Sequence, residues 1–401
     1  MPRHTLICTV GTSLFYPNLV GLPSSETYES WLNKQPDRDR PYLSPDFVEK
    51  LKSNWSEIQQ QPIDDRNWQP IAELLAELPS TVRLCGAEIN SIFDLIDRHY
   101  CTPDCKLYFC HSATEDGRQI AALLTHYYRV KKYQVEDPKE IEHLQDTHPK
   151  LFRTKGLRNL AKAIGKIVRE TGSEFCAIDA TGGYKAQIAI GVLMGQALGV
   201  PVYYKHERFS EIIAFPPMPV SLDFELWQNH SGLLEALERE ELLLWENVAE
   251  DWEEKMEVTI KREDIDSRSY ITLSPTGQIF HDTFKSRFDA SKDEYLPPPV
   301  PRDRKSRPTL PDHGWENARS LILRLLQTIT DDCPYVCGCR THYWNPSLPS
   351  VTHFRLQGEQ IEGIFSRGNW TVKFYVDASA KTSGQQAACI ADLNQRLKDW
   401  I

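Results

Sequence analysis

One ten-residue stretch, AIDATGGYKA at 177–186, constrains the fold of this chain more than any other. An apolar run from Phe175 to Ile178 enters it as a buried strand would, and a helix-forming run from Tyr184 to Leu198 leaves it. The two glycines let backbone N–H groups approach an anion, and the start of a helix favours negative charge there. Lys185 adds a cation. The stretch therefore predicts either a phosphate-binding turn or a tight β–α turn with an exposed lysine.

Two other predicted strands end in small polar side chains. The run from His4 to Val10 predicts a strand that leads into Thr12 and Ser13, and the run from Lys106 to Cys110 predicts a strand that leads into the polar turn 111–117. Parallel strands present their carboxyl ends at one edge of a sheet, where open α/β sheets hold ligands. We therefore expect these hydroxyls and Lys185 to share one rim.

The same order of strand, polar turn and helix recurs as far as about residue 225. It predicts a doubly wound, mostly parallel α/β sheet, with further strands at 200–204 and 211–215. The polar stretch 16–80 interrupts this order, and its helical runs at 44–60 and 68–77 are expected to pack on the sheet as an insertion.

Composition narrows the class of protein. A length of 401 residues allows two or three domains, and 40% hydrophobic with 25% charged residues is typical of a globular protein. No apolar run is long enough to span a bilayer, and the first residues do not form a signal peptide, so we expect a cytoplasmic protein without a membrane partner. The net charge of −10 argues against a surface that coats nucleic acid.

Beyond residue 225 the sequence changes character. A charged helix is expected at 232–255, and the run 271–277 with the helix after it is typical of a winged-helix unit, so 226–295 is read as a connector. The segment 296–311, LPPPVPRDRKSRPTLP, predicts a stiff linker. Residues 312–401 predict a small α+β domain, with helices at 315–330 and 383–400 and three or four strands between them.

Seven short motifs, in this order, resemble the CARF domain of type III CRISPR-associated proteins. They are VGTSL, CGAEIN, SATEDG, TKGL, DATGGYKA, VYYKHE and PPMPV. The resemblance covers about residues 1–225 and implies a Rossmann-like homodimer that binds a cyclic oligoadenylate, with the tetramer as the expected ring. The ligand-binding residues that it implies are Gly11, Thr12, Ser13, Glu88, Asn90, Ser112, Thr114, Asp116, Gly117, Thr181, Gly182, Gly183, Tyr184 and Lys185.

The resemblance also implies an enzyme. Members of the family that act as ring nucleases carry a serine in the first turn and a lysine in TGGxK, and this chain has Ser13 and Lys185 at those positions. A ribose 2′-hydroxyl would attack its own 3′-phosphate without a metal or cofactor, and Lys185 would stabilise the charge that develops on phosphate. Ser13 would orient the hydroxyl or bond a phosphate oxygen.

Two resemblances compete for residues 312–401. A restriction-endonuclease-like module would hold a divalent metal with Glu362, but Thr371, Val372 and Lys373 do not form its E-x-K motif, and Asp377 is a distant substitute. A RelE-like ribonuclease, acting on RNA or at the ribosome, would instead use basic residues without a metal. The candidate effector residues are Glu362, Arg367, Lys373 and Asp377, with Arg355 as a further basic group. A HEPN ribonuclease is rejected, because its R-x4-6-H motif matches only 307–313, outside any helix.

Ten cysteines are scattered without a disulfide pattern and are expected to be free thiols. Cys333, Cys337, Cys339 and His342 have no standard zinc spacing, so buried thiols are the preferred interpretation and no metal site is assigned.

Three functions therefore remain open. The first is a dimeric cyclic oligoadenylate receptor that cuts its own ligand, a nuclease of the phosphodiesterase type. The second is a sensor with a ligand-activated nuclease in its C-terminal domain. The third is a transcription regulator that uses the winged helix on DNA, which the acidic stretch 235–263 disfavours.

Overall fold

The computed structural model describes residues 2–206, 209, 211–217, 223–240, 242–249, 252–311, 315 and 318–401. These residues form two compact units, Met1–Val220 and Ser221–Ile401, called here the N-terminal and C-terminal units. The ends of the motifs VYYKHE and PPMPV, and most of 312–317, lie outside the described residues.

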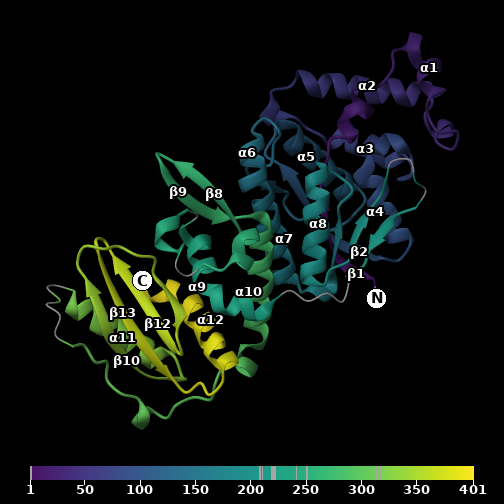
Figure 1. Cartoon of the computed structure of the whole chain (residues 1–401). Helices are drawn as coiled ribbons and strands as arrows, with labels where there is room; N and C mark the ends of the chain where they lie inside the picture. Colours follow the sequence, from purple (N-terminus) through teal and green to yellow (C-terminus); the bar gives the residue numbers. More distant parts are fainter. Residues whose placement is uncertain are drawn as a thin grey trace. The chain divides into compact units, whose positions relative to one another are not determined.

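A six-stranded sheet lies at the centre of the N-terminal unit, in the order β3-β2-β1-β4-β5-β6 (Figure 1). Its strands are β1 Arg3–Thr9, β2 Cys101–Ser112, β3 Lys139–Ile141, β4 Cys176–Asp179, β5 Val202–Tyr204 and β6 Ile213–Phe215. All neighbours pair in parallel except β5 and β6, which are antiparallel. The expected mostly parallel α/β sheet is confirmed, and β1 lies at its centre between β2 and β4.

Helices flank this sheet. They are α1 Tyr28–Leu32, α2 Pro45–Gln60, α3 Gln69–Glu77, α4 Ala87–Asp97, α5 Glu115–Val130, α6 Pro149–Leu151, α7 Leu157–Thr171 and α8 Lys185–Leu198. The expected helices at 44–60 and 68–77 are confirmed as α2 and α3. The rings of Phe15, Trp55 and Trp68 pack together at centroid distances of 4.9 to 5.9 Å, which ties this insertion to the turn after β1.

The C-terminal unit begins with α9, Phe224–Glu240. The expected helix at 232–255 is wrong in its second half, because Leu243 and Leu244 form the short strand β7 and pair with β9. Strands β8 Ile260–Ile265 and β9 Arg268–Leu273 make a hairpin, and α10, Pro275–Tyr295, follows it with Ser274 as its N-cap. The run 271–277, expected to belong to a winged-helix unit with a helix after it, is the end of β9 and the first turn of α10.

A four-stranded antiparallel sheet with order β10-β13-β12-β11 occupies the end of the chain (Figure 1). Its elements are α11 Arg319–Asp332, β10 Val336–Asn345, β11 His353–Gln357, β12 Gln360–Arg367, β13 Trp370–Ala378 and α12 Ser383–Trp400. Apolar side chains from one face of the sheet form a single buried cluster with α11 and α12. Both helices therefore cover the same face, called here the helix-covered face, and the other is called the outer face.

The proline-rich segment 296–311 is bound to this sheet rather than free of it. The backbone N–H groups of Val300, Ser306 and Thr309 donate to the carbonyl oxygens of Pro334, Cys337 and Cys339 at 2.7 to 3.0 Å. The segment therefore runs beside β10 as part of the C-terminal unit. No helix among the described residues is both long and apolar enough to cross a membrane.

Candidate functional site

Two glycine turns meet at the carboxyl ends of the central strands β1 and β4. A Cβ atom built on Gly11 would lie 2.5 Å from the backbone nitrogen of Gly183, and one built on Gly182 would lie 2.5 Å from the carbonyl oxygen of Thr9. The Thr9 hydroxyl donates to the carbonyl oxygen of Gly182 at 2.6 Å. Only residues without a side chain allow backbones to approach this closely. The VGTSL turn therefore packs directly against the TGGYK turn.

Glu88, in the first turn of α4, lies behind both turns and is almost completely buried. Its Oε1 accepts a hydrogen bond from the Gly11 N–H at 2.6 Å, and its Oε2 lies 3.5 Å from the Ser13 hydroxyl. The Ser13 oxygen also accepts from the N–H of Ala87 at 3.1 Å. Burial raises the pKa of Glu88, although these hydrogen bonds oppose the shift. Glu88 therefore holds the first turn in place from within the core.

Asp179, the last residue of β4, holds the second turn. Its carboxylate accepts from the Thr181 N–H at 3.1 Å, from the Thr181 hydroxyl at 2.5 Å and from the Ser91 hydroxyl at 2.5 Å. Burial raises its pKa to about 6, and the nearby charge of Glu88 adds to the shift, while the three hydrogen bonds lower it. The Thr181 hydroxyl also accepts from the N–H of Lys205, which connects the turn to the end of β5.

Helix α8 begins at Lys185, directly after this turn. Gly183 has a φ of +96°, which favours glycine, and the Tyr184 N–H donates to the side-chain oxygen of Gln187 at 2.5 Å. The Tyr184 ring packs edge-on against Phe152 at 5.2 Å. The Lys185 side chain is exposed. The arrangement combines an exposed lysine with the positive end of a helix dipole and close backbone N–H groups.

The end of β2 supplies a second polar group to this edge of the sheet. The Ser112 and Thr114 hydroxyls lie 2.8 Å apart, and Thr114 caps α5 by accepting from the Gly117 N–H at 3.1 Å. Gly117 is buried close against Ser112, and a Cβ there would lie 2.5 Å from the Ser112 carbonyl oxygen. Asp116 is partly exposed beside them. These residues shape the start of α5, and the hydroxyls already bond to one another.

A pocket of about 380 Å³ opens beside the first turn. Its wall includes Ser13 and Asn90, which were both predicted from the sequence to bind the ligand. The Asn90 amide donates to the carbonyl oxygens of Ser80 and Val82, so it also holds the loop before α4. The other lining residues are Pro17, Asn18, Pro36, Arg38, Arg83, Gly86, Ala87, Lys205 and Phe209. The three basic side chains Arg38, Arg83 and Lys205 were not predicted, because they come from segments far apart in the sequence.

Apart from Asn90 in the pocket wall and Tyr184 at the N-cap of α8, the predicted ligand-binding residues fall into three groups. Gly11, Ser13, Glu88, Gly182 and Gly183 form one network through contacts between residues 75 to 173 positions apart in the sequence, and Thr181 is bonded to Asp179 beside it. Ser112, Thr114 and Gly117 form a second network at the end of β2. Thr12, Asp116 and Lys185 are at least partly exposed, and Lys185 is not among the described residues that line the pocket beside Ser13.

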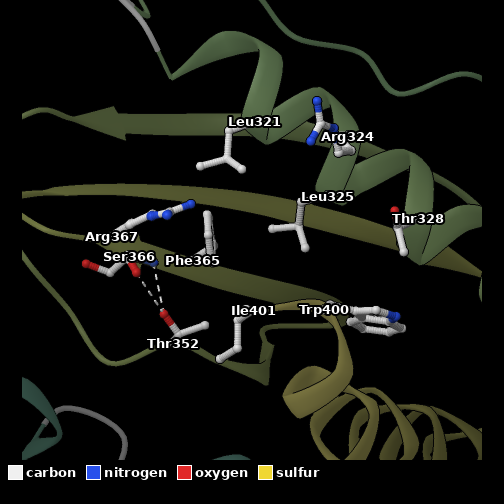
Figure 2. A pocket seen from close by; sticks show the side chains of 10 residues that line it. All are labelled: Leu321, Arg324, Leu325, Thr328, Thr352, Phe365, Ser366, Arg367, Trp400 and Ile401. Carbon is white, nitrogen blue, oxygen red and sulfur yellow. Dashed lines mark hydrogen bonds between the residues drawn. The ribbon is translucent and has the colours of Figure 1, made fainter.

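The four candidate effector residues are divided between the two faces of the C-terminal sheet. Lys373 lies between the core residues Val372 and Phe374 on β13, so it points to the outer face, and Glu362 lies opposite Tyr375 on that same face. Asp377 follows Tyr375 by two residues and also belongs to the outer face. Arg367 instead lines a pocket on the helix-covered face (Figure 2).

Glu362 does not fit a metal ligand, because both of its carboxylate oxygens already have cationic or imidazole partners. Oε2 accepts from Arg355 at 2.7 to 2.8 Å, and Oε1 lies 2.8 Å from the Nε2 atom of His342. Neither oxygen of Glu362 is therefore open to a metal ion in this arrangement.

A different trio of potential metal ligands, Glu235, Glu238 and His281, lies between α9 and α10. The Lys285 ammonium occupies this cluster, 2.8 Å from Glu235 and 2.9 Å from Glu238. Burial opposes ionisation of Glu238, yet His281 and Lys285 together hold its pKa well below the usual range. The Trp227 N–H donates to Nδ1 of His281, so Nε2 carries the ring proton and is not available to a metal. The cluster is an ion-pair network inside the unit.

All ten cysteines are free thiols, and Cys333 and Cys339 are buried as expected, whereas Cys337 is half-buried. Burial raises the pKa of both thiols to about 12. Zinc binds the thiolate form, which this environment disfavours.

Comparison with known proteins adds one match. Residues 83–218 match the sequence model of a family of CRISPR-associated proteins (Cas_APE2256). The matched region contains Glu88, the polar turn after β2 and the TGGYK turn, and it begins after the VGTSL turn. No curated protein matches the chain in sequence. The match supports a CRISPR-associated protein with a role in CRISPR defence.

Proposed function

We propose that the N-terminal unit is a Rossmann-like CARF domain that binds a cyclic oligoadenylate and opens the ring, in the antiviral response of a type III CRISPR system. The observation that carries the proposal is the contact between the turns at Gly11 and Gly182-Gly183, at the start of α8. At this contact, glycines leave the backbone of both turns open to a phosphate. A helix N-terminus and the exposed Lys185 lie at the same carboxyl edge of the parallel sheet.

The ligand class fits the chemistry of this edge. A ring of adenylates carries several phosphates, which suit backbone N–H groups, Lys185 and the exposed Arg38 of the adjacent pocket, whereas Lys205 of that pocket is already paired with Asp94. Its ribose hydroxyls suit the polar side chains at the ends of the strands. A ring with two-fold symmetry is best held by two copies of one turn, so the proposal includes a homodimer with one ring per dimer.

The proposed reaction uses this chain's own residues and no metal. A 2′-hydroxyl of the ring loses its proton to water and attacks the neighbouring phosphorus. The bond from phosphorus to the 5′-oxygen breaks, water protonates the departing oxygen, and a 2′,3′-cyclic phosphate remains. Lys185 stabilises the negative charge on the phosphate oxygens, which is strongest in the transition state. Ser13 orients the substrate through its hydroxyl, whose own position is set by Ala87 and Glu88.

Incubation with cyclic tetra- and hexa-adenylate, with and without EDTA, tests the proposal. We expect linear products with cyclic phosphate ends, equal rates in both conditions, and one ring bound per two chains by calorimetry. Failure to bind either ring at micromolar concentration would refute the binding function. Binding without cleavage over hours would leave a sensor and refute the ring nuclease.

A further inference from the structure

A row of polar and aromatic side chains crosses all four strands on the outer face of the C-terminal sheet. Arg340 on β10 lies opposite Tyr375 on β13, Tyr375 lies opposite Glu362 on β12, and Glu362 lies opposite Arg355 on β11. Directly opposed residues point to the same face, so these four form a continuous line. Because side chains alternate along each strand, this line lies on the opposite face of the sheet from the apolar cluster that α11 and α12 cover.

His342 joins this row through an irregularity in the pairing of β10. The register with β13 shifts between Thr341 and Tyr343, which puts the His342 ring over Tyr375 at 4.1 Å with an interplanar angle of 16°. The Nε2 atom of His342 lies 2.8 Å from Oε1 of Glu362. A bulge often redirects a side chain in this way beside an active site.

The hydrogen bond fixes the protonation of the ring. An ionised carboxylate can only accept, so Nε2 of His342 carries a proton and Nδ1 is the basic atom of the neutral ring. Glu362 is 2% exposed and His342 is 29% exposed, so the carboxylate is hidden while the imidazole reaches solvent. Arg355 binds the other oxygen of Glu362, so both carboxylate oxygens have a hydrogen-bond donor. The arrangement is that of an imidazole base oriented by a buried carboxylate.

Cations and rings surround the imidazole. The guanidinium of Arg340 lies 5.1 Å from the centroid of Tyr375, and the ammonium of Lys373 lies 5.3 Å from that of Tyr343. Aromatic faces beside cations bind single-stranded nucleic acid, since bases stack on the rings and phosphates pair with the cations. The charged and titratable groups on this face, among the described residues, are Arg340, His342, Tyr343, His353, Arg355, Glu362, Lys373, Tyr375 and Asp377.

We propose that the outer face is a metal-independent ribonuclease site for single-stranded RNA, with His342 as its general base, Glu362 as the residue that positions it, and Arg340 and Lys373 as phosphate-binding groups. Nδ1 of His342 takes the proton from a 2′-hydroxyl, and the 2′-oxygen forms a bond to phosphorus. The bond from phosphorus to the 5′-oxygen breaks, water protonates the departing oxygen, and His342 returns its proton to solvent. The product carries a 2′,3′-cyclic phosphate. The requirement for a 2′-hydroxyl selects RNA over DNA.

The proposed RNA site uses none of the residues proposed to bind the ring, so the experiment separates the two activities. The full-length Lys185→Ala chain, which we expect to leave cyclic tetra-adenylate intact, is incubated with an unstructured, end-labelled RNA oligonucleotide in EDTA, with and without the ring. We expect cleavage to cyclic phosphate ends in at least one condition, and none of the same sequence as DNA or as 2′-O-methyl RNA. Absence of RNA cleavage in both conditions, or cleavage of DNA, overturns the proposal.

Variants then assign the residues. His342→Ala should lower kcat on the order of 100-fold or more, as loss of a general base does, and added imidazole should restore part of it. Glu362→Gln, whose amide oxygen can still accept from Nε2 of His342, should lower kcat less than Glu362→Ala does, with KM unchanged in both, which a purely structural role would not give. Lys373→Ala should raise KM more than it lowers kcat. Arg324→Ala, a cation on α11 that faces the pocket of the helix-covered face, should leave cleavage unchanged (Figure 2).

Unfolding temperatures are measured for each variant. Because His342 is partly exposed, its replacement should leave the fold intact. A His342→Ala chain that is folded and still cleaves RNA within a few-fold of the parent rate refutes the assignment of the base.

Discussion

The two units contain buried carboxylates in opposite settings. Asp179 and Glu88 in the N-terminal unit accept hydrogen bonds from neutral hydroxyl and backbone N–H groups, and burial raises the pKa of both. Glu362 in the C-terminal unit lies between a guanidinium and an imidazole that reaches solvent. The first pair shapes backbone turns, and in the proposed ring nuclease it leaves the chemistry to exposed groups such as Lys185. The second carboxylate acts on a side chain that can itself meet a substrate.

This difference predicts that a substitution in one proposed site lowers the activity of that site and leaves the activity of the other unchanged. In the proposed ring nuclease, Lys185→Ala should slow ring opening on the order of 100- to 1000-fold, because it removes a charge aimed at the developing charge on phosphate. RNA cleavage in the C-terminal unit should persist. Single-turnover kinetics on cyclic tetra-adenylate and on RNA measure both effects.

Lys166→Ala is the matched control, since Lys166 is an exposed lysine on the neighbouring helix α7 that pairs with Glu170. We expect both activities of this variant to equal those of the parent chain. If Lys185→Ala opened the ring within a few-fold of the parent rate, ring opening would not depend on the Lys185 charge, and the proposed contrast between the two sites would be wrong.

The second prediction concerns the pH dependence of stability. The pKa of Asp179 is raised to about 6 in the fold, so between its unfolded value and pH 6 the folded chain binds more protons than the unfolded chain. The contribution of Asp179 to the free energy of unfolding is therefore fully present below its unfolded pKa. This contribution is lost as pH rises through 6, by about 3 kcal/mol in total.

Thermal unfolding of the parent chain and of Asp179→Asn at pH 5 and pH 7.5 isolates this effect. As pH rises from 5 to 7.5, the unfolding free energy of the parent chain should fall relative to that of Asp179→Asn. A difference that stays constant, or that moves in the parent's favour, would show that Asp179 is ionised without cost.

Much of the fold follows from local sequence pattern. The strands β1, β2 and β4 and the helices that follow them were predicted because apolar runs end at glycine and hydroxyl residues. The helix expected at 232–255 was wrong, because Leu243 and Leu244 pair with a strand almost thirty residues later, and helical periodicity alone does not reveal such a partner. The segment 296–311 shows the same limit, since its hydrogen bonds run to residues 334–339.

The candidate sites divide in the same way. Gly182 and Lys185 were found because they belong to one short motif. Arg38, Arg83 and Lys205 were missed, because only tertiary folding brings them to one pocket. On the C-terminal sheet, Glu362 was a candidate effector residue that one of two competing resemblances would use as a metal ligand, while its partner His342 was considered only as a zinc ligand. A register shift in β10 brings the two together, and the sequence contains no signal for that shift.

The third prediction tests the close contact between the turns. Gly182→Ala puts a methyl group 2.3 Å from Oε1 of Glu88 and 2.6 Å from the nitrogen of Gly11. We expect a loss of unfolding free energy of about 1–3 kcal/mol, as for other overpacked sites, together with weaker binding of cyclic tetra-adenylate. Calorimetric titration and thermal unfolding measure the two effects.

Gly384→Ala provides the control, because a Cβ at this position in α12 meets nothing within 4 Å. It should leave both measurements unchanged or raise stability slightly. Should Gly182→Ala bind the ring as tightly as the parent chain, the contact between the turns would not form part of the ligand site.

The smallest expected effect belongs to Ser13. Its hydroxyl oxygen accepts from the Ala87 N–H at 3.1 Å and lies 3.5 Å from Glu88, so part of its bonding capacity is already used within the protein. In the proposed reaction it contributes at most one hydrogen bond to the substrate. Removing one such bond costs about 1 to 1.5 kcal/mol, which corresponds to roughly a tenfold slower ring opening in Ser13→Ala.

Ser13→Thr distinguishes orientation from proton transfer, because it keeps the hydroxyl but restricts its rotation. If Ser13 only orients the ring, Ser13→Ala should change the rate by the same factor at every pH, and Ser13→Thr should recover part of the lost rate. A rate loss in Ser13→Ala as large as that in Lys185→Ala would mean that the serine takes part in the chemistry itself. The buried Glu88 beside it would then be the group to examine as a base, and the contrast drawn with Glu362 would no longer hold.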